Sequence, residues 1–377
     1  MRTKLAEDMG LEFPIFAFTH CRDVAAAVSK AGGLGVLGVA GHSLDTLGME
    51  LDWIEEQVDG KPYGVDLLLP AKFVGSDKGG FDASQLDEKI PQEHRRFLDE
   101  LLEKHGVPPL PPGEQPRPEF SVGYEKQRDV IELAFEHRIS LIASALGPPP
   151  SWMIEQGHAK GVKVAALAGT VDHARRHAEA GVDIVVAQGY EAGGHTGEIS
   201  TMVLVPEVVD AVDPLPVLAA GGIGNGRQLT ASLALGAQGV WTGSIWLTTE
   251  EAETHPVVKE KFLKASSRDT IRCRSLTGKP ARQLRSAWTE AWNDPANPDP
   301  LPMPLQPRLA REAQARIARS AHKAPGAEQL INYFVGQIVG SMNQVNSVRS
   351  VVEELVQEYA DTMERLDDWA QGSEADS

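Results

Sequence analysis

One histidine inside a glycine-rich stretch is the feature of this sequence that most clearly could do chemistry. Residues 188–197 read Gln-Gly-Tyr-Glu-Ala-Gly-Gly-His-Thr-Gly, so that His195 lies among four glycines. Glycine lets a backbone approach a ligand closely and present its N–H groups. An imidazole can take or give a proton near neutral pH. The stretch therefore indicates a reactive loop, and a structural turn with a surface histidine is the alternative.

Two further glycine-rich stretches are suited to hold a phosphate. Residues 219–227 read Ala-Ala-Gly-Gly-Ile-Gly-Asn-Gly-Arg, and residues 241–244 read Trp-Thr-Gly-Ser. Each follows a short apolar run, and each lies near an expected helix start. Glycine-rich loops after the last two strands of a β/α barrel commonly bind phosphate through N–H groups and a helix dipole. The pair predicts a phosphorylated cofactor.

Eight short apolar runs, separated by helical segments, must position these loops. Continuously apolar runs are typical of parallel strands that are buried on both faces. The runs cover residues 13–18, 34–37, 63–69, 139–143, 162–166, 183–187, 217–219 and 239–241. Thr170 and Asn225 are expected to cap the helices that Gly181 and Gly236 terminate. Repeated strand–helix order predicts a (β/α)8 TIM barrel, with an open doubly wound sheet as the alternative.

Two segments depart from this alternation and define the expected domains. Residues 1–270 should form the barrel, with an insertion near 84–120, and residues 271–377 a helix-rich C-terminal portion that packs on it and ends in a frayed acidic tail. Within the insertion, residues 84–105 predict one helix. A proline-rich loop at 108–118 follows and forms either a surface feature or a lid. Apolar residues at helical spacing from Val345 to Tyr359 indicate a packed last helix.

Two other motifs are misleading. Residues 33–38 match GxGxxG, but they follow an expected helix and open a strand, which is the reverse of the dinucleotide-binding order. His173 and His177 have the spacing of a metal pair, but Ala174-Arg175-Arg176 separates them, and two arginines would repel a cation. We therefore expect a solvated helix face there and no metal site.

Composition limits the classes of partner. The net charge of −17 argues against nucleic acid as a partner, because binding by so acidic a chain would gain nothing from counterion release. Cys21 and Cys273 are the two cysteines and indicate no disulfide framework. Acidic residues near the N-terminus argue against a signal peptide, and no apolar stretch is long enough to span a membrane. We expect a cytoplasmic protein that acts on small molecules, as a monomer or homodimer.

The motifs together resemble those of a known family. Residues 188–197, Ala219-Ala220-Gly221-Gly222-Ile223 and residues 235–244 resemble nitronate monooxygenases, once called 2-nitropropane dioxygenases. Residues 277–282 and 336–340 match further segments of that family, so the resemblance runs from near the N-terminus to about residue 340 but leaves the insertion unexplained. Residues 198–210 are also similar to the related FMN-dependent enoyl-ACP reductases.

The resemblance implies FMN as cofactor and a role for each matching residue. His195 would be catalytic and face the substrate. The residues that would bind FMN are Ala17, Phe18, Asp66, Gln188, Gly193, Gly194, Gly221, Gly222, Trp241, Thr242, Gly243, Ser244 and Gln337. Ala17-Phe18 stands where the family often has Pro-Met, and Asp66 where it often has Asn. Because a carboxylate cannot donate a hydrogen bond, Asp66 is expected to place negative charge near the flavin ring.

The implied reaction is the oxidation of alkyl nitronates, or of nitroalkanes, with O2 to a carbonyl compound and nitrite. His195 would orient the anion, or remove the α-proton of a neutral nitroalkane. The departures at Phe18 and Asp66 leave an alternative open, an NAD(P)H-dependent ene-reductase acting on an enoyl thioester. In that case His195 or water would protonate the second carbon.

Overall fold

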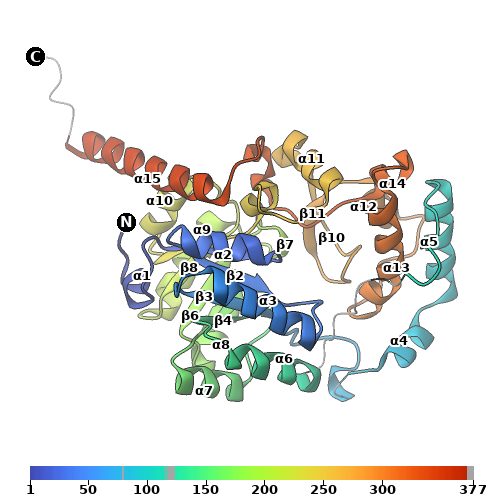
Figure 1. The fold of residues 1–377 in the computed structure, drawn as a ribbon, viewed down its shortest axis with the longest axis horizontal. Coiled ribbons are helices and arrows are strands. Elements are labelled where there is room, and N and C mark those ends of the chain that lie inside the picture. Colours follow the sequence, from blue (N-terminus) through green and yellow to red (C-terminus); the bar gives the residue numbers. More distant parts are fainter. Residues whose placement is uncertain (79, 115, 117–123, 372–377) are drawn as a thin grey trace, which may run out of the picture.

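Eight strands close into a parallel barrel in the computed structural model, which describes residues 1–78, 80–114, 116 and 124–371 (Figure 1). The barrel strands are β1 (Ile15–Thr19), β2 (Leu34–Gly38), β3 (Tyr63–Leu68), β4 (Leu141–Ala145), β5 (Lys163–Ala168), β6 (Ile184–Gln188), β8 (Val217–Ala220) and β9 (Gly239–Thr242). The last strand, β9, pairs with β1, with Ile15 opposite Val240, and this closes the ring. The predicted (β/α)8 barrel is confirmed, and the open sheet is excluded.

Each barrel strand divides its side chains between the lumen and the surrounding helices, because successive side chains of a strand point to opposite faces. Phe16, Val36 and Leu141 belong to the cluster that fills the lumen. Val65 and Ala166 pack outward beneath the helices. All five are fully buried, which explains why the strands appear in the sequence as unbroken apolar runs.

Two of the helices around the barrel, α8 (Val171–Ala180) and α10 (Gly226–Ala234), begin and end at the expected caps. The others are α1 (Lys4–Asp8), α2 (Arg22–Lys30), α3 (Leu44–Gln57), α6 (Tyr124–Glu136), α7 (Ser151–Lys160) and α9 (Thr201–Val212). The Thr170 side chain accepts the N–H of His173, and Gly181 ends α8 at a φ of 91°. The Asn225 side chain likewise caps α10, and Gly236 follows at a φ of 94°. These caps confirm the predicted helix boundaries.

The GxGxxG stretch belongs to the packing of the barrel, as expected from its position after α2. A Cβ atom on Gly35 would lie 2.0 Å from the carbonyl oxygen of Ala25 in α2. The glycine is therefore needed for the close approach of helix and strand, and the stretch opens β2 rather than a helix.

The insertion contains η1 (Ser76–Lys78), α4 (Ala83–Lys89) and α5 (Gln92–Lys104). The prediction of a single helix over residues 84–105 was wrong. Pro91 divides it, because proline lacks an N–H and disfavours helical backbone in the residue before it, and Ile90 is accordingly extended. Of the proline-rich loop, residues 115 and 117–123 lie outside the described residues.

The C-terminal portion contains both helices and strands. Its elements, from the end of β9 onward, are η2 (Ser244–Thr248), α11 (Pro256–Lys264), η3 (Ser267–Asp269), β10 (Thr270–Cys273), β11 (Ala281–Leu284), α12 (Ala287–Asn293), α13 (Leu305–Ser320), α14 (Pro325–Leu330), η4 (Gln337–Ser341) and α15 (Val348–Gln371). The two strands and β7 (Gly194–His195) form a small antiparallel sheet in the order β10-β11-β7. This sheet joins the C-terminal portion to the loop that follows β6.

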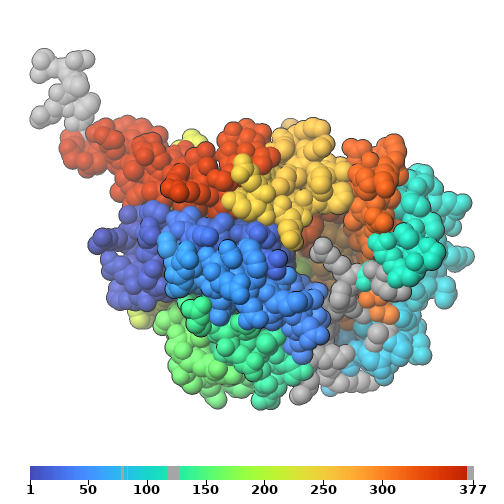
Figure 2. Space-filling model, viewed as in Figure 1, coloured from blue at the N-terminus to red at the C-terminus, as the bar shows by residue number. Residues whose placement is uncertain are grey.

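The insertion packs on the C-terminal portion (Figure 1, right). The Arg308 guanidinium of α13 contacts both carboxylate oxygens of Asp87 in α4, at 2.9 and 2.5 Å. Phe97 of α5 meets Trp292 of α12 edge to face, with ring centroids 4.8 Å apart. The molecular surface is hollowed between these elements and the dark-blue part of the barrel (Figure 2).

The last helix, α15, packs along α10 and α2. Val348, Val352 and Leu355 are buried, which confirms the predicted packing stripe, whereas Val345 precedes the helix and is 43% exposed. The acidic tail from residue 372 lies outside the described residues. No helix in the described ranges is long and apolar enough to cross a membrane.

Candidate active site

The glycine-rich loop lies at the C-terminal end of β6 and packs tightly against its neighbours. Its Gly194 and His195 pair with Arg282 and Ala281 of β11. A Cβ atom on Gly189 would lie 2.1 Å from the hydroxyl oxygen of Thr201, and one on Gly193 would lie 2.8 Å from the amide nitrogen of Gly336. The glycines therefore bring three separate segments together beside His195.

Two polar side chains fix the loop in place. The Glu191 carboxylate accepts both the N–H and the hydroxyl of Thr201, each at 2.9 Å, at the start of α9. Arg282 is 2% exposed, and its Nε and Nη2 donate to the carbonyl oxygen of Tyr190 at 3.1 and 2.9 Å. The backbone before His195 is thus held from both sides.

His195 is half-buried between two residues of the C-terminal portion. Its Nε2 lies 2.8 Å from the hydroxyl oxygen of Thr277, and its ring centroid lies 6.2 Å from that of Phe334. Burial, followed by the charge of Lys279, lowers the pKa of His195 to about 4. The imidazole is therefore neutral at neutral pH.

The charge of Lys279 acts on His195, and the charge of a second lysine, Lys72, acts on Lys279. Lys279 is half-buried, and its N–H approaches the Thr277 hydroxyl oxygen at 3.4 Å. Burial, followed by the charge of Lys72, lowers the pKa of Lys279. No carboxylate in the described part of the chain forms an ion pair with either ammonium group. An anion would relieve this unbalanced charge.

The loops after β8 and β9 offer unpaired backbone N–H groups. They lie side by side, because Ala220 and Trp241 pair at the ends of these strands. Within the described residues, the N–H groups without an acceptor in these loops include those of Gly222, Ile223, Gly243 and Ser244. The Ser244 hydroxyl oxygen accepts the N–H of Gly336 at 2.8 Å, which leaves its hydrogen available to a ligand.

The start of α10 differs from the expected phosphate site. The N–H of Gly226 donates to a Glu358 carboxylate oxygen of α15 at 2.7 Å, and the N–H of Gly224 donates to the Gln228 side chain at 2.8 Å. The helix terminus is therefore already satisfied by a carboxylate. The N–H groups still available to a ligand are those of the loop residues that precede the helix.

Asp66 faces the lumen near the C-terminal end of β3. Its sequence neighbours Val65 and Leu67 pack outward, and its strand partners are Gly38 and Ala143. The side chain is 6% exposed, and its Oδ2 has no hydrogen-bond partner among the described residues. Burial raises the pKa of Asp66 well above its usual range. This favours a neutral acid, in contrast to the negative charge expected from the sequence.

The other predicted flavin-binding residues on the strands divide between the two faces. Phe18 and Trp241 pack in the lumen, and Trp241 stacks on Phe16 at 6.5 Å. The Ala17 side chain packs outward, and the Thr242 hydroxyl donates to the Phe16 carbonyl and accepts from Trp246. For Ala17 and Thr242, therefore, only the backbone can contact a ligand in the lumen.

Gln188 and Gln337 belong to two different segments that meet at the glycine-rich loop after β6. Gln188 ends β6, opposite Ala220 of β8. Gln337 begins η4, and its N–H donates to the carbonyl oxygen of Glu191 at 2.9 Å. The segment around Gly336 therefore contacts both the histidine loop and the loop after β9.

Of the two histidines on α8, His173 is exposed and His177 is buried. The prediction of a solvated face was wrong for His177, which is 3% exposed and whose Nε2 lies 3.0 Å from the carbonyl oxygen of Leu167. His177 thus fastens α8 to β5, and burial lowers its pKa.

Comparison with known proteins agrees with this geometry. The family model described as nitronate monooxygenase matches residues 9–358. The chain belongs to the nitronate monooxygenase family. A Mycobacterium tuberculosis protein, provisionally named a monooxygenase, is 59% identical over 97% of this chain and 98% of its own. A Staphylococcus saprophyticus protein, provisionally named a nitronate monooxygenase, is 30% identical over 97% and 99%.

Solved structures of the same fold cover the whole molecule. Nitroalkane oxidase from Streptomyces ansochromogenes has a TM-score of 0.78 and 25% identity, over 96% of this chain and 99% of its own. FabK from Thermotoga maritima has a TM-score of 0.73 and 28% identity, over 98% and 99%. Membership of the nitronate monooxygenase family makes this protein a flavin-dependent oxidoreductase. The unpaired N–H groups and the Oδ2 of Asp66 fit such a cofactor, because both need a partner that the protein does not supply.

Four residues that lie around His195 or hold its loop were absent from the sequence-based set: Glu191, Thr277, Lys279 and Phe334. Three lie within motifs that carried the family resemblance, so closer use of those motifs could have found them. Nothing in the local sequence of Phe334 indicates its place beside His195. That place depends on its bridge to Gln283 of β11.

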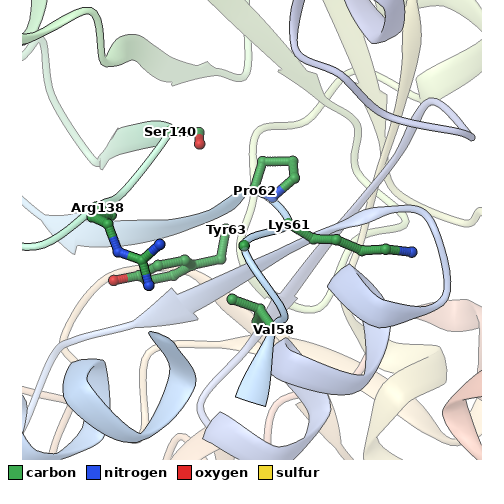
Figure 3. Close-up of a pocket in the computed structure, with 7 residues that line it drawn as sticks. Val58, Lys61, Pro62, Tyr63, Arg138 and Ser140 are labelled. Atoms are coloured by element: carbon green, nitrogen blue, oxygen red, sulfur yellow. The ribbon is translucent and has the colours of Figure 1, made fainter. Parts of the chain in front are cut away.

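A small cavity of about 140 Å³ lies at the opposite end of the barrel and is lined by Lys61, Tyr63 and Arg138, among others (Figure 3). Its two charged lining residues are paired. Lys61 contacts Glu12 at 3.2 Å, and Arg138 contacts Glu55 at 3.3 Å. The Arg138 side chain lies beside Tyr63, whose hydroxyl donates to Glu55 at 3.0 Å. The charged groups of this cavity are thus satisfied within the protein, unlike Lys279 beside His195, which has no carboxylate partner among the described residues.

Proposed function

We propose that the protein is an FMN-dependent nitronate monooxygenase, which converts alkyl nitronates and O2 to carbonyl compounds and nitrite. The observation that carries the proposal is the neutral His195 beside the unpaired Lys279, at the barrel end where the phosphate-binding loops open. Active sites of this fold lie at that end.

FMN, rather than a flavin without a phosphate, is supported by the loops after β8 and β9. The N–H groups of Gly222, Ile223 and Ser244, together with the Ser244 hydroxyl, would bind the phosphate. Bound FMN would supply the electron transfer between substrate and O2. The remaining flavin contacts are proposed for Gln188, Gly193 and Gln337.

The charges around His195 support an anionic substrate. A nitronate carries its negative charge on the two oxygens of its nitrogen, and Lys279 would hold that group. The Thr277 hydroxyl lies 3.3 Å from the Lys279 carbonyl oxygen, which can only accept a hydrogen bond. If Thr277 donates to that carbonyl, it accepts the Nε2–H of His195, and Nδ1 then carries the free lone pair.

The low pKa of His195 favours a preformed nitronate over a neutral nitroalkane. A base with a pKa of about 4 is weak, and efficient proton abstraction needs a pKa near the working pH. A nitronate has already lost this proton, so His195 needs only to orient it. With this pKa His195 is almost entirely unprotonated at neutral pH, which weakens the ene-reductase alternative in which it donates the proton.

The proposed reaction balances without another reductant. The α-carbon of the nitronate gains one oxygen atom, its bond to nitrogen breaks, and nitrogen leaves with its two oxygens as nitrite. Two nitronates and one O2 then give two carbonyl compounds and two nitrites.

The test is to mix the flavin-loaded enzyme anaerobically with propyl-2-nitronate, 2-nitropropane, NADH or NADPH and to follow flavin bleaching. We expect rapid bleaching with the nitronate, and oxygen uptake with nitrite release in air. Rapid bleaching by NADPH, with reduction of an enoyl thioester and no nitrite, would instead establish the ene-reductase.

A further inference from the structure

The carboxyl group of Asp66 is a buried polar group to which the proposed reaction assigns no role. It projects into the lumen from β3, between Gly38 of β2 and Ala143 of β4. Its Oδ2 is fully buried without a partner among the described residues. An unsatisfied buried polar atom costs about 1–3 kcal/mol, so its persistence calls for a function.

The strands around Asp66 provide no counter-charge. Leu34–Gly38 and Leu141–Ala145 contain no titratable side chain, and the lumen residues Phe18 and Gln188 are uncharged. The titratable group next to this part of β2 is His20, whose Nδ1 lies 3.1 Å from the Gly38 carbonyl oxygen. His195 and Lys279 are further titratable groups at this end of the barrel.

We propose that Asp66 is a neutral carboxylic acid that hydrogen-bonds the ring of the bound flavin, donating through its O–H and accepting through its C=O. The inference rests on the proposed flavin site. The flavin ring carries adjacent C=O and N–H groups, and a carboxylic acid matches such a pair with two hydrogen bonds. A primary amide has the same donor and acceptor arrangement, whereas a carboxylate can only accept.

Burial alone raises the pKa of Asp66, and this supports the neutral form. Below the ordinary pKa of 3.8, such a carboxyl group is protonated in both the folded and the unfolded chain, so it does not reduce the free energy of unfolding. Stability then falls as the pH rises from 3.8 toward the raised value, because the unfolded chain ionises first. The neutral acid therefore has a signature that can be measured apart from turnover.

The experiment compares the wild-type holoenzyme with Asp66→Asn and Asp66→Leu. FMN dissociation constants from equilibrium dialysis, at pH 7, should be similar for wild type and Asp66→Asn and about tenfold weaker for Asp66→Leu, the loss expected for one to two hydrogen bonds. The same pattern with riboflavin would place the contact on the ring, because riboflavin lacks the phosphate. The flavin midpoint potential should fall in Asp66→Leu and stay near wild type in Asp66→Asn.

Two further measurements examine the proton itself. The infrared spectrum of the holoenzyme at pH 7 should show a carboxylic-acid C=O band that is absent in Asp66→Asn. Wild-type FMN affinity should fall as the pH rises through the raised pKa, while that of Asp66→Asn stays level. Taking the difference between the two proteins cancels contributions from His20, His195 and Lys279.

Several outcomes would overturn the inference. Tighter FMN binding in Asp66→Asn at pH 7 would show that Asp66 is ionised, and equal binding in all three proteins would show that it does not touch the flavin. Failure of the wild-type protein to retain any flavin would refute the proposed function instead. If Asp66→Leu does not fold, two comparisons of wild type with Asp66→Asn still test the inference. These are the infrared C=O band and the pH dependence of FMN affinity.

Discussion

The two ends of the barrel differ in whether their polar groups have partners within the protein. At the N-terminal end, Lys61, Arg138 and Tyr63 all have partners, and Glu55 alone accepts hydrogen bonds from two of them. At the C-terminal end, Asp66 and Lys279 have no charged partner among the described residues, and several loop N–H groups are unpaired.

The difference teaches where to look for function in this fold. Both ends belong to the same strands and the same apolar core, so burial alone does not distinguish them. A satisfied polar group stabilises the fold, whereas an unsatisfied one costs stability and persists where a ligand completes it. Substitutions at the two ends should therefore change different quantities.

The largest effect should come from His195→Asn. Loss of the imidazole should lower kcat/KM for a nitronate by roughly 10²-fold, the scale expected when a substrate-orienting group is removed, and leave FMN affinity unchanged. Wild-type activity should stay level from neutral pH down toward pH 4, where His195 becomes protonated. Steady-state kinetics across pH measures both.

The matched control is His158→Asn. His158 is an exposed histidine that pairs with Asp183 at 3.1 Å, away from the glycine-rich loops. An equal loss of kcat/KM in both variants would show that the two ends do not differ as described.

Lys279→Gln should have the next largest effect. Removing the charge should raise KM for a nitronate about tenfold, equivalent to roughly 1.4 kcal/mol, with a smaller change in kcat. High salt should weaken wild-type binding and reduce the difference, because salt screens the attraction. Lys61→Gln, at the N-terminal end, is the control. A KM unchanged in Lys279→Gln would remove the argument for an anionic substrate.

The strand order and the position of the glycine-rich loops could be predicted from the sequence. Local patterns placed His195 and the glycine-rich loops after β8 and β9 at the same end of the barrel, because strand ends of one parallel sheet lie together. The apolar runs and the caps at Thr170 and Asn225 gave the strand and helix order. These features depend on residues close to one another in the chain.

The rest depended on contacts between distant segments. Thr277 and Phe334 reach His195 only because β11 pairs with both β7 and residue 334. Burial supplied by the neighbouring strands raises the pKa of Asp66, and this burial could not be deduced from the local sequence. The carboxylate that caps α10 comes from Glu358, 132 residues away from Gly226.

Ser244→Ala should have a smaller effect, confined to the phosphate. The substitution removes the hydroxyl donor and the acceptor of the Gly336 N–H. We expect FMN affinity to fall by roughly threefold to tenfold, as for one hydrogen bond, and riboflavin affinity to stay unchanged. Equilibrium dialysis with the two flavins measures the difference. An equal loss of both flavins would place Ser244 away from the phosphate.

Glu55→Gln should have the smallest effect on activity, and it tests the N-terminal end directly. Burial opposes ionisation of Glu55, but hydrogen bonds from Arg138 and Tyr63 outweigh it and lower its pKa. A lowered carboxyl pKa adds stability that is present above the ordinary value of 4.5 and is lost as the pH falls through the folded value. The variant should lose about 1 kcal/mol in urea unfolding at pH 7, and less at pH 3. Its kcat and KM should match wild type, since paired groups at this end support the barrel and do not meet the substrate. A loss of turnover without a loss of stability would reverse the roles assigned to the two ends.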